Sequence, residues 1–212
     1  HGFFFFFFGF FSQLALCSAQ PVVFVSPASD LQAVLGSASA GSIIDFEAGN
    51  YLSGCSLALT TSITLRGSGG RANIVLDCGL ANRNLLVSGR DVAVNISGIT
   101  FRDGSANGGG CILIEGGAAV TVSNAVFTGC VSSTVGGAVS VVDLSSLDLK
   151  DVVFERNQAA SNGGALYVYN SSISVESSSF IGCQANVSGG AVFASTAASL
   201  YLNGVTMQGN AA

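Results

Sequence analysis

The stretch NGGALYVYNSSISVESSSFIGCQ, residues 162–184, joins a glycine pair to alternating apolar and polar residues, then a phenylalanine and a cysteine. The same order recurs along the chain. A column of large apolar residues repeats at intervals of 26, 27, 26 and 27 residues: Phe101, Phe127, Phe154, Phe180 and Met207. Glycine pairs keep the same period at Gly136-Gly137, Gly163-Gly164 and Gly189-Gly190. Two independent markers with one period indicate an internal repeat.

The residues before each phenylalanine alternate with a period of two. Leu147, Leu149 and Val152 are apolar before Phe154, and Asp148 lies between them. This period is typical of strands, whereas a helical repeat would place apolar residues three and four apart. Glycine pairs would also destabilise each helix by roughly 1 kcal/mol per Gly relative to Ala.

A unit of this length buries its apolar face only by stacking on its neighbours. Roughly 26 residues fit three short strands at about 3.3 Å per residue plus turns. Parallel crossovers are almost always right-handed. The sequence therefore predicts an all-β fold, a right-handed parallel β-helix over residues 20–212. A further Gly-Gly-Ala would be due after residue 212, so we expect more coils to follow.

Composition excludes two classes of protein. Hydrophobic residues make up 49% of the 212 residues and charged ones only 9%, yet after residue 19 no apolar run approaches the roughly 20 residues of a membrane span. A solenoid core explains the apolar content. The net charge is −5 and the seven Lys and Arg residues are scattered, so no basic stripe for nucleic acid is expected.

The first 19 residues have the apolar core and small-residue exit of a secretory signal, with cleavage expected after Ala19. The alternative is a membrane-anchoring segment. The chain begins with His1, so we expect the first residues of the signal to be missing. A signal predicts a secreted or cell-surface protein, the outer membrane if bacterial. In a eukaryotic secretory pathway, Asn95, Asn170 and Asn186 would be candidate glycosylation acceptors.

A short helix is predicted after the signal. Ser29 and Gln32 have the spacing of a capping box, and Gly36 would end the helix. Leu31 and Leu35, with Val34, would share one apolar face. We expect this helix to cover the open end of the solenoid, where the first coil would otherwise expose its core.

Two motifs alternate in the second half of the chain: GGAV or GGAL at residues 136–139, 163–166 and 189–192, and FERN at 154–157. This pattern resembles the repeats of the polymorphic outer membrane proteins, surface proteins with a pectin-lyase-like right-handed β-helix. Cys111 departs from the first motif, and Cys130 and Cys183 depart from the second. The glycines permit tight bends, and we expect Asn157 and Asn210 to turn their amides toward backbone groups of the turn.

The cysteine positions predict two disulfides, Cys55–Cys78 and Cys111–Cys130, with Cys183 unpaired. Cys55 and Cys111 each follow a glycine at the start of a coil, and a second cysteine lies near the closing turn of that coil. Cys130 and Cys183 would lie two coils apart, about 9.6 Å, beyond the roughly 7 Å Cα limit of a bridge. The alternative is a set of buried free thiols.

Catalytic residues are hard to assemble from this sequence. The single histidine is His1, and the acidic residues fall mostly one per coil. Asp148, Asp151 and Glu155 gather on one coil, and Asp77 and Asp103 on others, but the stacking predicts neutral neighbours for the first group. We interpret both as solvated edges, with a catalytic or calcium site as the alternative.

The sequence thus predicts no catalytic, cofactor or metal residues, and a structural or adhesive module that binds protein or glycan ligands. A carbohydrate-active enzyme of the pectate lyase or glycoside hydrolase type, or an inactive relative, is the alternative function. Several Asp residues with Arg or Lys on one face would favour it.

Overall fold

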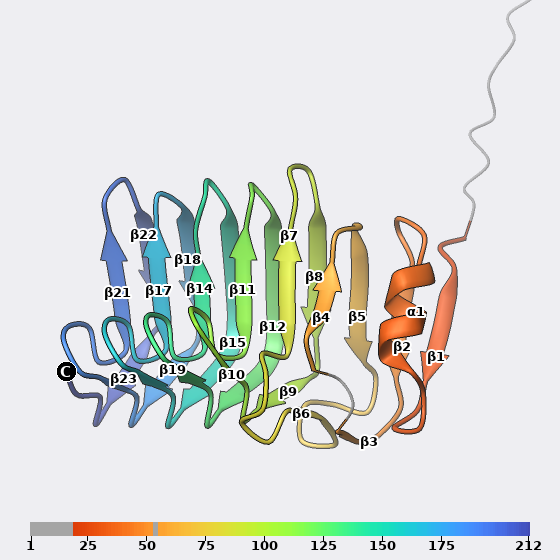
Figure 1. Cartoon of the computed structure of the whole chain (residues 1–212), viewed down its shortest axis with the longest axis horizontal. Helices are drawn as coiled ribbons and strands as arrows, with labels where there is room; N and C mark the ends of the chain where they lie inside the picture. Colours follow the sequence, from red (N-terminus) through yellow and green to blue (C-terminus); the bar gives the residue numbers. More distant parts are fainter. Residues whose placement is uncertain (1–18, 53–54) are drawn as a thin grey trace, which may run out of the picture.

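The computed structural model describes residues 19–52 and 55–212, so the predicted signal, apart from Ala19, lies outside the described residues. The chain winds as a right-handed parallel β-helix with one short helix at its N-terminal end (Figure 1). The predicted fold class is confirmed. Every strand pair recorded in the described part of the chain is parallel, and successive coils stack along one axis.

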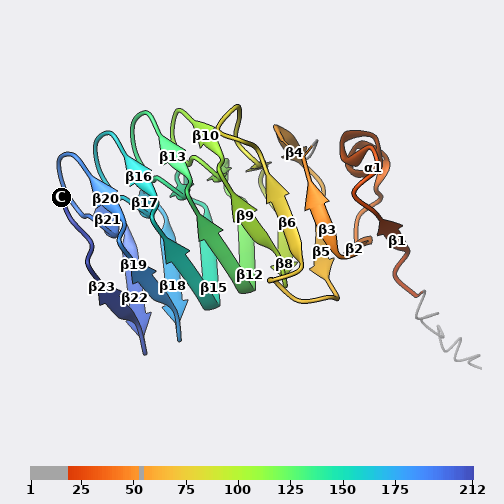
Figure 2. The ribbon, with the colours of Figure 1, turned by 90° about the horizontal axis from the view of Figure 1, so that it is seen from below.

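Three sheets run along this axis. Sheet A has 13 strands: β1 (Val22–Val25), β2 (Ile43–Phe46), β3 (Gly49–Tyr51), β5 (Ile63–Gly67), β6 (Ile74–Asp77), β8 (Ala93–Ser97), β9 (Thr100–Arg102), β12 (Ala119–Thr128), β15 (Ser146–Glu155), β18 (Ser172–Glu176), β19 (Ser179–Ile181), β22 (Ser199–Asn203) and β23 (Thr206–Gln208). Sheet B has β4 (Leu57–Leu59), β7 (Leu85–Ser88), β11 (Ile112–Glu115), β14 (Val139–Val141), β17 (Leu166–Tyr169) and β21 (Val192–Ser195). Sheet C has the two-residue strands β10 (Ser105–Ala106), β13 (Val131–Ser132), β16 (Gln158–Ala159) and β20 (Gln184–Ala185), which lie side by side in Figure 2.

Sheet A bends within each regular coil at a residue with positive φ. Asn124 (φ 47°) and Asp151 (φ 55°) bend the ten-residue strands β12 and β15, and Ser177 (φ 48°) separates β18 from β19. Glycine holds this position in two further coils, at Gly98 and Gly204. Because Asn, Asp and Gly tolerate the left-handed region better than most residues, the bend is encoded by short polar residues and glycine.

The register of the coils is the one that the phenylalanine period predicts. Phe127 pairs with Phe101 on one side and with Phe154 on the other, and Phe154 pairs with Phe180. All four rings are fully buried and stacked, with centroids 5.0, 4.9 and 4.8 Å apart. Met207 keeps the register opposite Phe180, but its side chain is 49% exposed, so it does not extend the buried column.

Glycine pairs sit where the chain enters sheet B, and Gly136-Gly137 shows the reason. Gly136 has φ +63°, in the region that favours glycine. A Cβ on Gly137 would overlap the carbonyl oxygens of Gly164 and Gln158. The first glycine therefore supplies the turn, and the second allows the backbones of neighbouring coils to approach closely.

The helix α1 (Leu31–Ser37) packs against β4, the first strand of sheet B, and buries Leu31 and Leu35 in the core. The predicted boundaries are wrong. Asp30 is the N-cap and accepts a hydrogen bond from Ala33 N at 3.1 Å, whereas Ser29 Oγ accepts one from Ser26 N. Gly36 lies inside the helix, because Ala38 N–H closes the last turn on Leu35 O without a left-handed residue.

A buried tyrosine ties the first coil together. Tyr51 is fully buried, and its hydroxyl donates hydrogen bonds to the carbonyls of Val25 (2.9 Å) and Glu47 (2.8 Å). Burial, helped by the charge of Glu47, raises the pKa of Tyr51 to about 12. The hydroxyl therefore stays protonated and keeps donating throughout the physiological pH range.

Candidate functional site

The motif residues meet inside each coil, at the corner where the turn after sheet A faces the start of sheet B. We call this position the interior corner. By the strand register, its residue pairs in successive coils are Asn84 and Gly104, Cys111 and Cys130, Ala138 and Asn157, Ala165 and Cys183, and Ala191 and Asn210. Where one side offers Gly or Ala, the other offers Asn or Cys, so side-chain volume is shared across the corner.

Asn157 shows what the asparagine does there. Its amide donates to Phe127 O (3.0 Å) and accepts from Cys130 N (3.0 Å), which satisfies two backbone groups of the preceding coil. Asn210 repeats both bonds with Phe180 O (3.0 Å) and Cys183 N (2.8 Å). Asn157 is fully buried, so these bonds satisfy polar groups that water does not reach. The turn role expected of both residues is confirmed.

Cysteine holds the corner in other coils. Cys111 and Cys130 are disulfide-bonded with Cα atoms 5.6 Å apart, and Cys55 and Cys78 are bonded at the same Cα separation. These are the two pairs expected from the sequence. Cys183 is unpaired and buried, with its sulfur 3.7 Å from Phe154 O, and burial raises the pKa of its thiol. The thiol therefore stays neutral and inert in the core.

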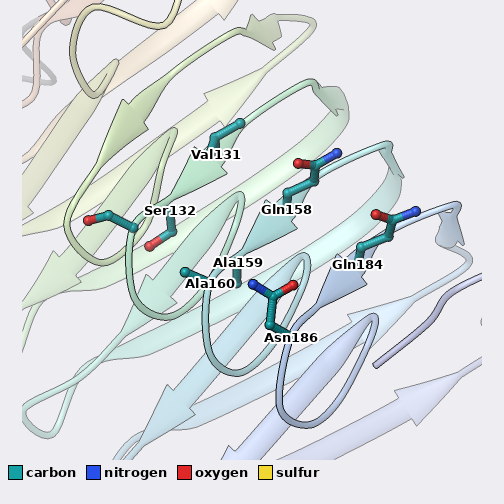
Figure 3. Close-up of a pocket in the computed structure, with 8 residues that line it drawn as sticks. Val131, Ser132, Gln158, Ala159, Ala160, Gln184 and Asn186 are labelled. Atoms are coloured by element: carbon teal, nitrogen blue, oxygen red, sulfur yellow. The ribbon is translucent and has the colours of Figure 1, made fainter.

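A groove crosses the outer face of sheet C and is the candidate binding site. It has a volume of about 240 Å³ and crosses β13, β16 and β20 (Figure 3). Its lining is uncharged: Val131, Ser132, Ser133, Gln158, Ala159, Ala160, Gln184 and Asn186. Gln158 pairs with Gln184 in the register, and in Figure 3 their side chains project from adjacent strands in the same direction.

The sequence did not single out this groove. Gln158 and Gln184 stand one coil apart, each after a residue of the F-x-x-N position, and that spacing is a signal that could have found the pair. Asn186 was singled out only as a glycosylation acceptor. It is exposed beside the groove, Asn95 is exposed on β8, and Asn170 is half-buried in a turn with φ 47°.

The first acidic group lies on the outer surface of sheet A. Asp148 is flanked in the register by Thr121 and Ser174, and Glu155 by Thr128 and Ile181, as the stacking predicts. Glu155 makes an ion pair with Arg156 at 3.1 Å, and Arg156 is largely exposed. Within residues 19–52 and 55–212, no three His, Cys, Asp or Glu side chains are grouped to hold a metal ion.

The second acidic group is more tightly organised. Arg102 Nε lies 3.0 Å from Asp77 Oδ2 and 3.9 Å from Asp103 Oδ2. Burial opposes ionisation of Asp77, but a hydrogen bond from Gly79 N and the Arg102 guanidinium outweigh it, so the pKa of Asp77 is lowered. Burial, together with the charge of Asp77, raises the pKa of Asp103 despite Arg102.

The fold and this corner architecture place the chain in the class of parallel β-helix proteins. Comparisons with protein-family models, with curated proteins and with solved structures found no match to this chain. In the described part of the chain, no helix is long and apolar enough to cross a membrane.

Proposed function

We propose that this chain is a secreted or cell-surface β-helix module with a structural or adhesive role, which binds protein or glycan partners through its outer faces. The observation that carries the proposal is the groove over sheet C, where exposed amide side chains repeat from coil to coil. A solenoid repeats the same outward positions along its length, which suits extended partners.

The motifs and the cysteines support the proposed location. The Gly-Gly-Ala and F-x-x-N repeats resemble those of polymorphic outer membrane proteins, which act at a cell surface. Two buried disulfides are compatible with an oxidising compartment. Expression of a gene that includes the segment before Val22, followed by N-terminal sequencing of the exported product, tests the signal. We expect the product to begin at Gln20, and retention of residues 1–19 would contradict a cleaved signal.

Adhesion is tested with the full chain coupled to fluorescent beads. Beads are applied to extracellular matrix proteins, cell-wall preparations and glycan arrays, and beads that carry the reduced and alkylated chain serve as the control. We expect saturable retention on at least one surface that the control beads do not show. Equal retention of both kinds of bead on every surface would refute an adhesive role.

The carbohydrate-active alternative is favoured by one observation, the opposite pKa shifts of Asp77 and Asp103 beside Arg102. Pairs of carboxylates with divergent pKa values are typical of acid and base assignments in hydrolases. The test is release of unsaturated or reducing products from polygalacturonate and from neutral polysaccharides, with calcium present. Product formation that Asp103→Asn abolishes and Asp148→Asn leaves intact would favour the enzyme. We expect none above a blank.

A further inference from the structure

The groove over sheet C presents hydrogen-bonding groups that the protein does not use itself. In the described part of the chain, the side-chain amides of Gln158, Gln184 and Asn186 have no hydrogen-bond partner. Ser132 differs, because its hydroxyl accepts from Gly108 N and donates to Val135 O. A ligand in the groove therefore meets a row of free amides, each with two donors and one acceptor oxygen.

The shape of the groove follows from small residues between these amides. Ala159 and Ala160 lie between the strands that carry Gln158 and Asn186, so no side chain fills the middle (Figure 3). Gln158 and Gln184 are register partners on adjacent coils, about 4.8 Å apart. The free amides thus repeat along the solenoid axis at a spacing close to the length of one hexose unit in an extended oligosaccharide.

Charge and backbone bonding select among classes of partner. No charged side chain lines the groove, which disfavours nucleic acid, polyuronates and charged peptides. The backbone is already bonded between coils: Gln158 N donates to Cys130 O, Ala160 N to Ser132 O and Asn186 N to Ala159 O. An extended peptide would therefore find no free strand edge to extend.

We propose that the groove over sheet C binds a neutral oligosaccharide laid along the solenoid axis, with Gln158, Gln184 and Asn186 as the hydrogen-bonding residues. This proposal rests on the adhesive function proposed above and names its partner class. Binding at a single groove is expected to be weak, because these exposed amides are also solvated in the free protein, and adhesion would then depend on several copies displayed together.

The experiment uses the full chain, isotopically labelled and exported to a bacterial periplasm so that disulfides form and Asn186 stays unmodified. Neutral hexasaccharides (cello-, xylo- and manno-) are titrated to millimolar concentration, with hexagalacturonate as the charged comparator. We expect side-chain amide NMR signals of Gln158, Gln184 and Asn186 to shift with at least one neutral sugar. The Gln158→Ala/Gln184→Ala variant should bind that sugar at least tenfold more weakly.

Two controls separate a site from a general effect. Gln208→Ala removes an exposed amide on β23, outside the groove, and should leave binding unchanged. Ala160→Leu should block the groove, whereas Ala119→Leu on the exposed face of β12 should not. The proposal is overturned if no neutral sugar shifts the groove amides, or if binding survives the double variant. Bead adhesion to a deglycosylated protein that persists in the double variant would overturn the groove proposal and leave the adhesive function standing.

Discussion

Truncation of Phe154 tests how much the interior column stabilises the stack. The ring is fully buried between Phe127 and Phe180, with centroids 4.9 and 4.8 Å away and planes 6° and 4° from parallel. Removing a buried phenylalanine side chain typically destabilises by about 3–5 kcal/mol, through lost transfer energy and the cavity left behind. Because both neighbouring coils are regular strands that cannot collapse into the gap, we expect Phe154→Ala to fall in the upper half of this range.

A pair of milder variants isolates the ring stacking. Phe154→Leu keeps most of the volume but loses two ring pairs, whereas Phe101→Leu loses only the pair with Phe127. Each aromatic pair contributes about 0.5–1.5 kcal/mol beyond its buried area. Phe154→Leu should therefore be the more destabilising by about that amount.

The assay is equilibrium denaturant unfolding followed by circular dichroism, with Tyr167→Ala on the outer face of sheet B as the surface control. Tyr167 stacks on Phe193 at 5.7 Å but is only half-buried, so its loss should matter less than that of Phe154. Equal unfolding free energies for Phe154→Ala and the native chain would refute the stacked core.

Three further perturbations have defined signs. Asn157→Ala should destabilise by about 2–4 kcal/mol in the same melt, because it leaves Cys130 N–H and Phe127 C=O buried and unpaired; a loss below about 0.5 kcal/mol would contradict this. Gly137→Ala should destabilise, since its Cβ would overlap backbone oxygens, whereas Gly36→Ala has open space in a helix and should stabilise by about 0.5–1 kcal/mol; equal signs would be inconsistent with the account. Asp77 has a lowered pKa when folded, so its stabilisation is complete above the unfolded pKa and is lost as pH falls through the folded one; Asp77→Asn should therefore flatten the acid limb of a stability-against-pH curve, and an unchanged limb would rule this out.

The periodic features were predictable because each coil repeats them. The phenylalanine register, the glycine turns and the disulfide pairs follow from a period that places equal residues one above another. The helix boundaries were missed because Ser29, Asp30 and Gln32 offer competing caps, and only packing of Leu31 and Leu35 on β4 decides between them.

Contacts outside the repeat could not be read from sequence. Arg83 donates hydrogen bonds to the carbonyls of Asn107, Gly108 and Gly109 and holds the loop of the next coil, yet it stands alone in the sequence. Arg71 reaches Asp151 O at 2.7 Å, 80 residues away. Each depends on the path of an irregular loop, which no period describes. The sheet C groove was missed for a related reason, since its hollow comes from Ala159 and Ala160 rather than from a motif.

Disulfide mapping under non-reducing conditions tests the coil register most directly, because a bridge forms only between residues whose Cα atoms lie within roughly 7 Å. The account predicts a Cys55–Cys78 peptide pair and a Cys111–Cys130 pair, with Cys183 alkylated only after unfolding. Cys130 and Cys183 share one column two coils apart, about 9.6 Å along the axis. A Cys130–Cys183 peptide from the native protein would contradict both the register and the number of coils between these residues.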